Sequence, residues 1–353
     1  MTTMQYSEFS GRIYGKTYQA SVPSHGHFEL TFRCPLKCGF CYCSCYTSPE
    51  HTRNELSTAE VLAILDQAAE GGCLWMTFSG GDPFVRADFR AIYDHARGLG
   101  MILNILCSGV LLTDEWLQHL QHAPPLKIEI PLYGITAETH EAVSGKKGTF
   151  AAVMKNIRRL LEAEVPLRIK TKITTQNLRE VKAVEKFVEE ELGLSFNPNH
   201  LLYPRLNGDR APIQYRLSPA QVVEMEQEFG KVACESTTEN QGADTATDKL
   251  FRCAAGINSF YINPYGEMNF CTYVRTESWS LRTGLIGDGV KHLKQTLLTR
   301  TLPKESSCVS CSIQSSCDNC PGRAVLETGS LEGKSEYLCD LNHAVRGKEK
   351  HGT

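Results

Sequence analysis

The sequence predicts an α/β fold in which a parallel sheet of strand–helix units is followed by a smaller, cysteine-rich region. Two observations indicate this. From Gly26 onward, short apolar runs alternate six times with helical patterns, and seven cysteines fall between Cys253 and Cys339 among turns. Repeated strand–helix units favour parallel pairing with right-handed crossovers. Six units can close most of a barrel or lie open as a doubly wound sheet, and the pattern alone does not choose between them.

The individual elements follow from hydrophobic periodicity. Candidate strands are His27–Phe32, Leu74–Phe78, Met101–Leu106, Leu126–Leu132, Leu167–Thr174 and Leu194–Leu202. Candidate helices are Thr58–Glu70, Arg86–Leu99, Asp114–His122, Thr149–Glu164, Leu178–Leu192 and Pro219–Phe229. Two helix starts carry local signals, because "STAE" at Ser57–Glu60 is a capping box and "SPAQ" at Ser218–Gln221 adds proline at the first helical position.

Composition limits the function classes. The 353 residues suffice for about two domains, and 37 Lys and Arg nearly balance 40 Asp and Glu. This balance argues against duplex nucleic acid or an anionic membrane surface as partner. The N-terminus lacks the apolar core of a signal peptide and no apolar run is long enough to span a bilayer, so we expect a cytoplasmic protein. Fifteen cysteines in a reduced compartment are better interpreted as metal ligands than as disulfides.

The strand–helix rhythm stops at a polar, turn-rich stretch, "ESTTENQGADTATDK", which is typical of a linker. The region after it holds a candidate hairpin, "YINPYGEMNF", but few long apolar segments, so it needs a metal or another staple. We place the boundary near Asp248. The expected organisation is an N-terminal extension at 1–26, the strand–helix domain at 27–234, the linker at 235–249, the cysteine-rich domain at 250–345 and a tail at 346–353.

The first cysteine group follows the first candidate strand directly. Cys34, Cys38 and Cys41 are spaced C-x3-C-x2-C, at the sheet edge where parallel α/β folds bind ligands. Three close ligands are one short of the four that a structural zinc or a closed iron–sulfur cluster takes. Cys43 and Cys45 can supply the fourth thiolate, so a closed structural metal site is the alternative at this point.

The run "CPLKCGFC" resembles the signature of radical S-adenosylmethionine (SAM) enzymes. The resemblance implies a partial (β/α)6 TIM-type barrel in which the three cysteines hold a [4Fe–4S] cluster with one open iron. That iron would chelate the amino and carboxylate groups of SAM, and reduction would cleave SAM to a 5′-deoxyadenosyl radical that abstracts hydrogen from a substrate. On this resemblance Cys43 and Cys45 are bystanders, and Phe40 matches the aromatic position that packs near the adenine.

A second motif supports the same pocket. "FSGGDPF" ends the second candidate strand and resembles the family's Gly-Gly-Glu-Pro element, whose backbone contacts the cofactor's amino group. Gly80, Gly81 and Pro83 match, and Asp82 replaces the glutamate. Because backbone groups make that contact, we expect the shorter acid to matter little. By itself, a Gly-Gly turn indicates only a close approach of the backbone.

Two further strand ends and one charged strand complete the expected cofactor site. "CSG" places Ser108 where relatives often have Thr-Asn-Gly, and "IPLYG" places Pro131 where many have serine, which puts one ribose contact in doubt. In "PLRIKTKIT", Arg168, Lys170 and Lys172 share one face. A solvated face is the alternative. In a barrel, charges under the helices are costly, so Lys170 and Lys172 are predicted to face the lumen and pair with the cofactor carboxylate or an acidic substrate.

The C-terminal cysteines have two interpretations. Pairs of C-x2-C are typical of zinc ribbons, although seven cysteines do not divide into tetrahedral sites. The array also resembles the SPASM domain, with one departure: two residues, not three, separate Cys317 from Cys320. The resemblance implies two auxiliary iron–sulfur clusters. Their ligands would be Cys308, Cys311, Cys317 and Cys339 for a closed outer [4Fe–4S] cluster, and Cys253, Cys271 and Cys320 for an inner one nearer the barrel. The inner cluster then has an open iron, a smaller core or a remote ligand such as Cys234.

Enzymes with both parts commonly modify peptides or proteins, so the resemblance predicts a maturase of a ribosomally made peptide by cross-linking, oxidation or epimerisation. A reductant such as flavodoxin or ferredoxin is implied. Only about 26 residues precede the first strand, so leader recognition would need a separate protein. The alternatives are a small-molecule enzyme of the haem-precursor or sugar type, a sulfatase-type maturase, and a non-catalytic iron–sulfur carrier or zinc scaffold.

The sequence names no acid–base residue. Tyr133, Tyr203 and Arg205 end barrel strands and are candidates to face substrate, although tyrosines there more often serve packing. His25 and His27 precede the first cysteine group, where unpaired histidines usually have local structural reasons.

Overall fold

The computed structural model describes residues 4–43, 52–229, 249–253, 255–317 and 319–349. It contains one open sheet with strand order β6-β5-β4-β3-β2-β1-β7-β8-β9. The pairs from β6 to β7 are parallel, and the last two pairs are antiparallel. The strands are β1 (His25–Thr31), β2 (Trp75–Gly80), β3 (Ile102–Leu106), β4 (Lys127–Pro131), β5 (Leu167–Lys172), β6 (Asn197–Asn199), β7 (Ser259–Ile262), β8 (Glu267–Asn269) and β9 (Ser278–Ser280).

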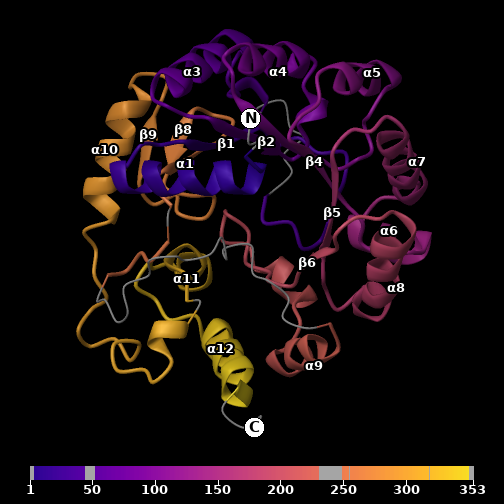
Figure 1. The fold of residues 1–353 in the computed structure, drawn as a ribbon. Coiled ribbons are helices and arrows are strands. Elements are labelled where there is room, and N and C mark those ends of the chain that lie inside the picture. The colour runs from indigo at the N-terminus through magenta and orange to yellow at the C-terminus, as the bar shows by residue number, and fades with distance from the viewer. Residues whose placement is uncertain (1–3, 44–51, 230–248, 254, 318, 350–353) are drawn as a thin grey trace.

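Helices form an arc outside the strands (Figure 1). The α-helices are α1 (Tyr6–Ala20), α3 (Thr58–Glu70), α4 (Phe89–Gly98), α5 (Asp114–His122), α6 (Ala137–Ser144), α7 (Thr149–Glu162), α8 (Val181–Lys186), α9 (Pro219–Phe229), α10 (Ile286–Leu297), α11 (Pro321–Thr328) and α12 (Glu336–Glu349). Shorter helical turns are η1 (Pro83–Val85), η2 (Leu178–Glu180), η3 (Phe187–Glu191), η4 (Ala211–Tyr215) and η5 (Gln314–Ser316). The predicted α/β fold with a parallel sheet, left open as in a partial barrel, is confirmed.

Local signals located several elements to the residue. The bounds of α3, α5 and α9 coincide with the predicted helices. At α3, the Ser57 hydroxyl accepts from the Glu60 amide while the Glu60 carboxylate accepts from the Ser57 amide, which is the predicted capping box. Such reciprocal bonds satisfy backbone donors that the helix itself leaves unpaired, so a motif of four residues is enough to predict where the helix begins.

Other elements differ from the prediction. The last barrel strand is only Asn197–Asn199, because Pro198 lacks a donor and the strand lies at the sheet edge. The predicted helix Leu178–Leu192 is divided into η2, α8 and the wider turn η3, in which the Leu192 amide donates to the carbonyl of Phe187. In the described part of the chain, five helices lie where no element was predicted, namely α1, α6, α10, α11 and α12.

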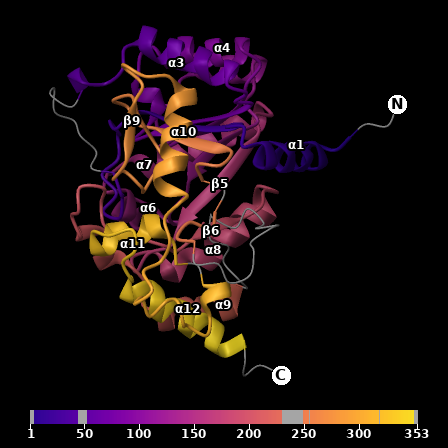
Figure 2. The same cartoon turned by 90° about the vertical axis from the view of Figure 1, so that its left-hand side faces the viewer.

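Helix α1 lies at the start of the first two strands and projects away from the barrel helices (Figure 2). The Trp75 indole donates to the Tyr6 hydroxyl at 2.8 Å, and the Tyr14 ring packs edge-on against His25. None of the α1 residues is fully buried. The contacts of α1 therefore come from aromatic and polar side chains. Such residues give only a weak helical periodicity, which does not stand out in the sequence.

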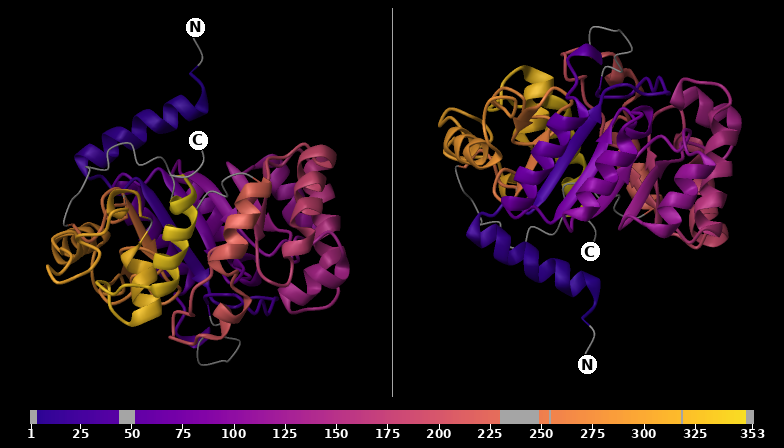
Figure 3. Two further views of the ribbon diagram at one scale, coloured as in Figure 1. Left: turned by 90° about the horizontal axis from the view of Figure 1, so that it is seen from below. Right: turned by 90° about the horizontal axis from the view of Figure 1, so that it is seen from above.

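The cysteine-rich region is joined to the barrel through the sheet itself. The predicted hairpin forms as β7 and β8, and β7 pairs in parallel with β1 from His25 opposite Ser259 to Phe28 opposite Ile262. One apolar core continues from Phe28 and Val61 into Ile262 and the helix α10. Seen end-on, the strands lie between the orange and yellow C-terminal segments and the magenta helices of the barrel (Figure 3). Within the described ranges, no helix combines the length and apolarity needed to cross a membrane.

This pairing makes a stability prediction. A chain that ends at residue 248 lacks β7, so the edge of β1 and part of the shared core become exposed, and exposed strand edges promote aggregation. We expect the truncated chain to be aggregated or partly unfolded in circular dichroism and analytical ultracentrifugation. A folded, monomeric fragment would contradict the shared-core interpretation.

Candidate metal centres

The loop of residues 34–43, which carries Cys34, Cys38 and Cys41 and is called the primary cysteine loop below, begins just after β1 ends. The Cys41 amide donates to the Cys38 carbonyl at 3.1 Å, and the Leu36 amide lies 3.5 Å from the Cys34 sulfur. Tyr133, which follows β4, lies beside this loop. Burial raises the pKa of Tyr133 well above its usual value, and Cys38, Cys41 and Cys34 raise it further. The Cys38 sulfur is 3.9 Å from that hydroxyl. The sequence-predicted trio therefore converges at the carboxyl edge of the sheet.

Close backbone contacts hold this loop against the end of β2. The Gly81 amide donates to the Thr31 carbonyl at 2.7 Å, and the Asp82 amide donates to the Arg33 carbonyl at 2.9 Å. A Cβ on Gly80 would overlap the carbonyl of Thr31, and one on Gly81 would overlap that of Arg33. Gly80 also has φ of 136°, a conformation that favours glycine. The two glycines are thus required for the loop's position.

The other side of the loop rests on the end of α6. The Lys37 amide donates to the Ser144 carbonyl at 2.9 Å. Gly145, with φ of 68°, caps α6, and a Cβ there would overlap the Lys37 carbonyl. Phe40 packs edge-on against Tyr133, with ring centroids 5.4 Å apart. Its predicted contact with an adenine stays a prediction.

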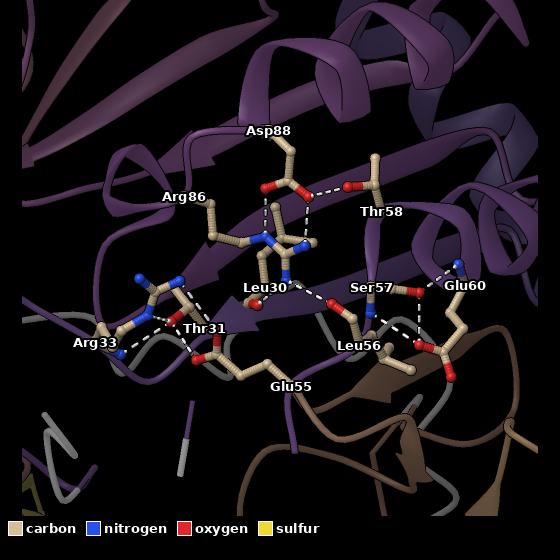
Figure 4. Close-up of polar contacts among 10 residues, drawn as sticks. All are labelled: Leu30, Thr31, Arg33, Glu55, Leu56, Ser57, Thr58, Glu60, Arg86 and Asp88. Atoms are coloured by element: carbon tan, nitrogen blue, oxygen red, sulfur yellow. Dashed lines mark hydrogen bonds and ion pairs between the residues drawn. The ribbon is translucent and has the colours of Figure 1, made fainter. Parts of the chain in front are cut away.

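Two polar clusters brace the start of the loop (Figure 4). The Arg33 guanidinium donates to Thr31 Oγ1 and to Glu55 at 3.1 Å each, and the Thr31 hydroxyl also donates to Glu55. Arg86 is buried and donates to the carbonyl of Leu30 at 3.0 Å, while Asp88 accepts two bonds from the same guanidinium. These charged side chains bond to one another and to the backbone of β1. They therefore stabilise the end of the strand that precedes Cys34.

Asp82 and Ser108 bond to each other. Asp82 is fully buried and accepts from the Phe84 amide at 2.9 Å, the Ser108 amide at 3.0 Å and the Ser108 hydroxyl. Burial raises the pKa of Asp82, and these bonds partly oppose that rise. The pair ties the loop after β2 to the loop after β3, which positions both. Their predicted direct contact with a cofactor stays a prediction.

The predicted cationic face of β5 carries neighbours from the adjacent strands. Lys170 Nζ lies 2.5 Å from Glu129 in β4, and Lys172 Nζ lies 2.6 Å from Asn199 in β6. Burial raises the pKa of Glu129, but Lys170 and Lys127 outweigh it, so the pKa is lowered overall. Lys170 therefore has a carboxylate neighbour within the protein. The pairing of either lysine with a cofactor remains a prediction.

Inner and outer cysteine sets form two further groups. Burial is the main cause that raises the pKa of Cys253 to about 11 and the pKa of Cys271 to about 12, and Cys320 raises both further. Cys253 also raises the pKa of Cys271. These three thiols are therefore close together. Cys234, the possible remote ligand, and Cys45 lie outside the described residues.

The outer four cysteines share one cavity. Cys308, Cys311, Cys317 and Cys339 all line it. Its wall also carries cationic and imidazole side chains, namely Lys249, Arg252, Lys334 and His343. The Cys311 sulfur lies 3.7 Å from His343 Nε2. An anionic group ligated by four thiolates is compatible with such a lining.

These groups suit clusters better than single ions. Among the described residues, no three His, Cys, Asp or Glu side chains converge closely enough to hold one metal ion. Cysteines that hold an iron–sulfur cluster bind different irons, so they need not meet at one point. None of the cysteines in the described ranges forms a disulfide. The all-thiol donor sets therefore fit iron–sulfur clusters.

Other flagged residues have structural neighbours. Arg205 bonds Asp209 at 3.0 Å in a turn, and His25 stacks on Trp75 with centroids 4.5 Å apart. Tyr203 is buried beside Tyr273. Glu29 is completely buried in β1 and belongs to none of the motifs described above. The signal was available, because "FELT" places one acid inside an apolar strand.

Comparisons with known proteins agree with this architecture. Residues 28–188 match the model of the Radical SAM superfamily. A PqqA peptide cyclase from Granulibacter bethesdensis is 39% identical over 150 residues, which cover 42% of this chain and 40% of the cyclase. The match thus spans about two fifths of the cyclase. An AdoMet-dependent heme synthase from Oleidesulfovibrio alaskensis is 27% identical over 347 residues, covering 88% of this chain and 86% of the synthase.

Two solved structures share the fold. Streptococcus suis SuiB bound to its precursor peptide SuiA has a TM-score of 0.68 at 17% identity, covering 96% of this chain and 82% of SuiB. The protein anSMEcpe, with bound AdoMet and the Cp18Cys peptide, has a TM-score of 0.67 at 13% identity, covering 93% of this chain and 97% of that one. Identities this low establish the fold and nothing finer.

The close approach at Gly81 predicts a loss of stability. Gly81→Ala forces a methyl group against the Arg33 carbonyl, and we expect the free energy of unfolding to fall by about 1–3 kcal/mol. Gly98→Ala is the control, because a Cβ there meets nothing within 4 Å. Denaturant unfolding of both variants measures the difference. Equal stabilities would mean that the loop has room to move.

Proposed function

We propose that this chain, whose residues 28–188 match the Radical SAM superfamily, is an enzyme that cleaves SAM reductively in order to modify a peptide. One observation carries the proposal: Cys34, Cys38 and Cys41 follow β1 in one loop at the carboxyl edge of the sheet, where the Cys38 sulfur lies 3.9 Å from the hydroxyl of the buried Tyr133. When bound, a [4Fe–4S] cluster and SAM supply the electron and the 5′-deoxyadenosyl radical that removes hydrogen from a substrate. The protein's own residues bind, orient and shield these groups.

Each part of the edge has a proposed role. Cys34, Cys38 and Cys41 hold the cluster and leave one iron for SAM. Gly80 and Gly81 present backbone groups to the amino group of SAM, and the absence of side chains on both keeps this backbone against the cysteine loop. The remaining proposed contacts are Phe40 with the adenine, Lys170 or Lys172 with the carboxylate, and Asp82 and Ser108 at the adjoining loops.

We assign the C-terminal cysteines to two auxiliary clusters. The shared cavity supports a closed outer cluster on Cys308, Cys311, Cys317 and Cys339. The mutual effects on pKa support an inner cluster on Cys253, Cys271 and Cys320. Burial of the inner thiols favours their neutral form, so loading that site requires the metal to displace their protons, which are released to solvent.

A peptide is the substrate class that we favour. The relatives include PqqA peptide cyclases, and both related structures carry a bound peptide. A separate leader-binding protein and a flavodoxin- or ferredoxin-type reductant complete the proposed system. A small-molecule substrate is the second candidate, because the heme synthase aligns over 88% of this chain.

The cofactor reaction can be tested with single cysteine changes. We expect the anaerobically reconstituted, reduced protein to form 5′-deoxyadenosine from SAM, detected by liquid chromatography. Cys38→Ser should reduce this product to background, whereas Cys43→Ser, the same chemical change beside the loop, should retain it. Absence of product from the wild-type protein with its cluster loaded would refute the proposal. Loss of product in Cys43→Ser would support a fourth protein ligand.

The outer cluster has a separate test. Cys308→Ala combined with Cys311→Ala removes two ligands from the shared cavity, so iron per chain should fall while 5′-deoxyadenosine formation persists. Turnover of a peptide encoded beside the gene, followed by mass spectrometry, should decrease. Normal peptide turnover would mean that the outer site is dispensable for catalysis, and modification of a haem precursor instead would favour the second candidate.

A further inference from the structure

We propose that Glu29 is a positioning residue that couples the primary cysteine loop to the inner cysteine group, one carboxylate oxygen serving each. The role of this coupling in catalysis rests on the cluster ligands assigned under the proposed function. The coupling itself is a property of the chain.

Glu29 lies on β1, on the face opposite Phe28 and Leu30. Its side chain is completely buried. Oε1 accepts a hydrogen bond from the hydroxyl of Tyr42 at 2.7 Å. Tyr42 follows Cys41 directly, and its own carbonyl accepts from the Leu206 amide at 2.9 Å. This oxygen therefore holds the end of the primary loop.

The second oxygen holds the other group. Oε2 accepts from the hydroxyl of Tyr261 in β7 and from Arg275 Nη2 at 3.3 Å. Arg275 Nη2 also donates to the Tyr261 hydroxyl at 2.5 Å, and its Nε donates to the carbonyl of Thr272 at 3.1 Å. Thr272 follows Cys271 directly. The guanidinium thus spans from the inner cysteine segment to the carboxylate in the barrel.

The charges in this arrangement are compensated within it. The carboxylate meets one guanidinium, two phenols and, at 3.9 Å from Oε1, the Cys43 sulfur. The guanidinium lies 5.4 Å from the ring centroid of Phe32. A buried ion pair is seldom better for stability than apolar residues of the same volume, but its geometry is specific. A hydrogen-bonded ion pair can fix the spacing between two cysteine groups. Apolar packing, which tolerates sliding, would fix that spacing less well.

The two oxygens give the coupling a direction that can be measured. Arg275 is remote from the primary loop in sequence, and its hydrogen bonds go to Glu29, Tyr261 and Thr272, none of which belongs to that loop. If Glu29 transmits the change, loss of the guanidinium leaves the carboxylate without its counter-charge and loosens Tyr42. If Glu29 is only a packing residue, the effect stays near residues 271–275. Tyr42 and Tyr273 also touch, with centroids 5.8 Å apart, and this contact does not involve Glu29.

The test is hydrogen–deuterium exchange with mass spectrometry on the reconstituted full-length protein. Arg275→Met is expected to raise exchange about fivefold or more in peptides covering residues 34–43 and Leu206, as well as near 271–275. In a Glu29→Gln background, the same Arg275→Met change should add little at residues 34–43. Tyr261→Phe removes one hydroxyl and keeps the ring, so it should produce a smaller change in the same peptides, even if the arginine variant folds poorly.

Glu327→Gln is the matched control. Glu327 pairs with Arg216, both side chains are nearly buried, and the pair also joins barrel to C-terminal region. Its loss should leave exchange at residues 34–43 unchanged. As a second readout, the electron paramagnetic resonance spectrum of the reduced protein with SAM should change in Arg275→Met and not in Glu327→Gln.

The outcomes separate the two proposals. Exchange that rises only near residues 271–275 in Arg275→Met, or equal effects of Glu29→Gln and Glu327→Gln at residues 34–43, would overturn the coupling. Wild-type protein that forms no 5′-deoxyadenosine, yet shows the coupled exchange, would overturn the proposed function and leave the coupling intact.

Discussion

The arrangement of this protein depends on one geometric constraint: parallel strands end together at one edge of the sheet. The ends of β1, β2 and β4 meet there, which brings Cys34, Gly81 and Tyr133 into one place although the chain separates them widely. The loop after β1 can occupy this place because backbone contacts backbone at Gly80, Gly81 and Gly145. Any side chain at those positions would displace the thiols.

The same constraint explains why the cysteine-rich region is not an independent appendage. It has few apolar segments of its own, and it extends the sheet by pairing β7 with the free edge of β1. The apolar core is continuous across this junction. Glu29 lies in the strand that both parts share, so its carboxylate can reach Tyr42 on one side and Arg275 on the other. Shared strand, shared core and buried ion pair all act to fix the spacing between the cysteine groups.

Structural features that depend on short sequence motifs could be predicted. Features that depend on contacts between distant segments could not. The start of α3 follows from a capping box of four residues, whereas the grouping of Cys308, Cys311, Cys317 and Cys339, which line one cavity, was implied by the resemblance to the SPASM domain. Helix α6 was missed although Gly145, its cap, also supports the primary loop. The bond between Asp82 and Ser108 was missed because each residue matched a motif separately, and a motif does not say what its side chain touches.

By itself, the sequence determined the alternation of strands and helices, the first cysteine group with its neighbouring glycines, and the C-terminal array of seven cysteines, because periodicity and spacing are local properties of the chain. Only the tertiary structure decided that β7 joins the barrel sheet, that Lys170 lies against Glu129, and that one buried carboxylate connects Tyr42, Tyr261 and Arg275. Glu29 and Arg275 are 246 positions apart, and a contact over such a distance depends on how the whole sheet is ordered. No local pattern encodes that order.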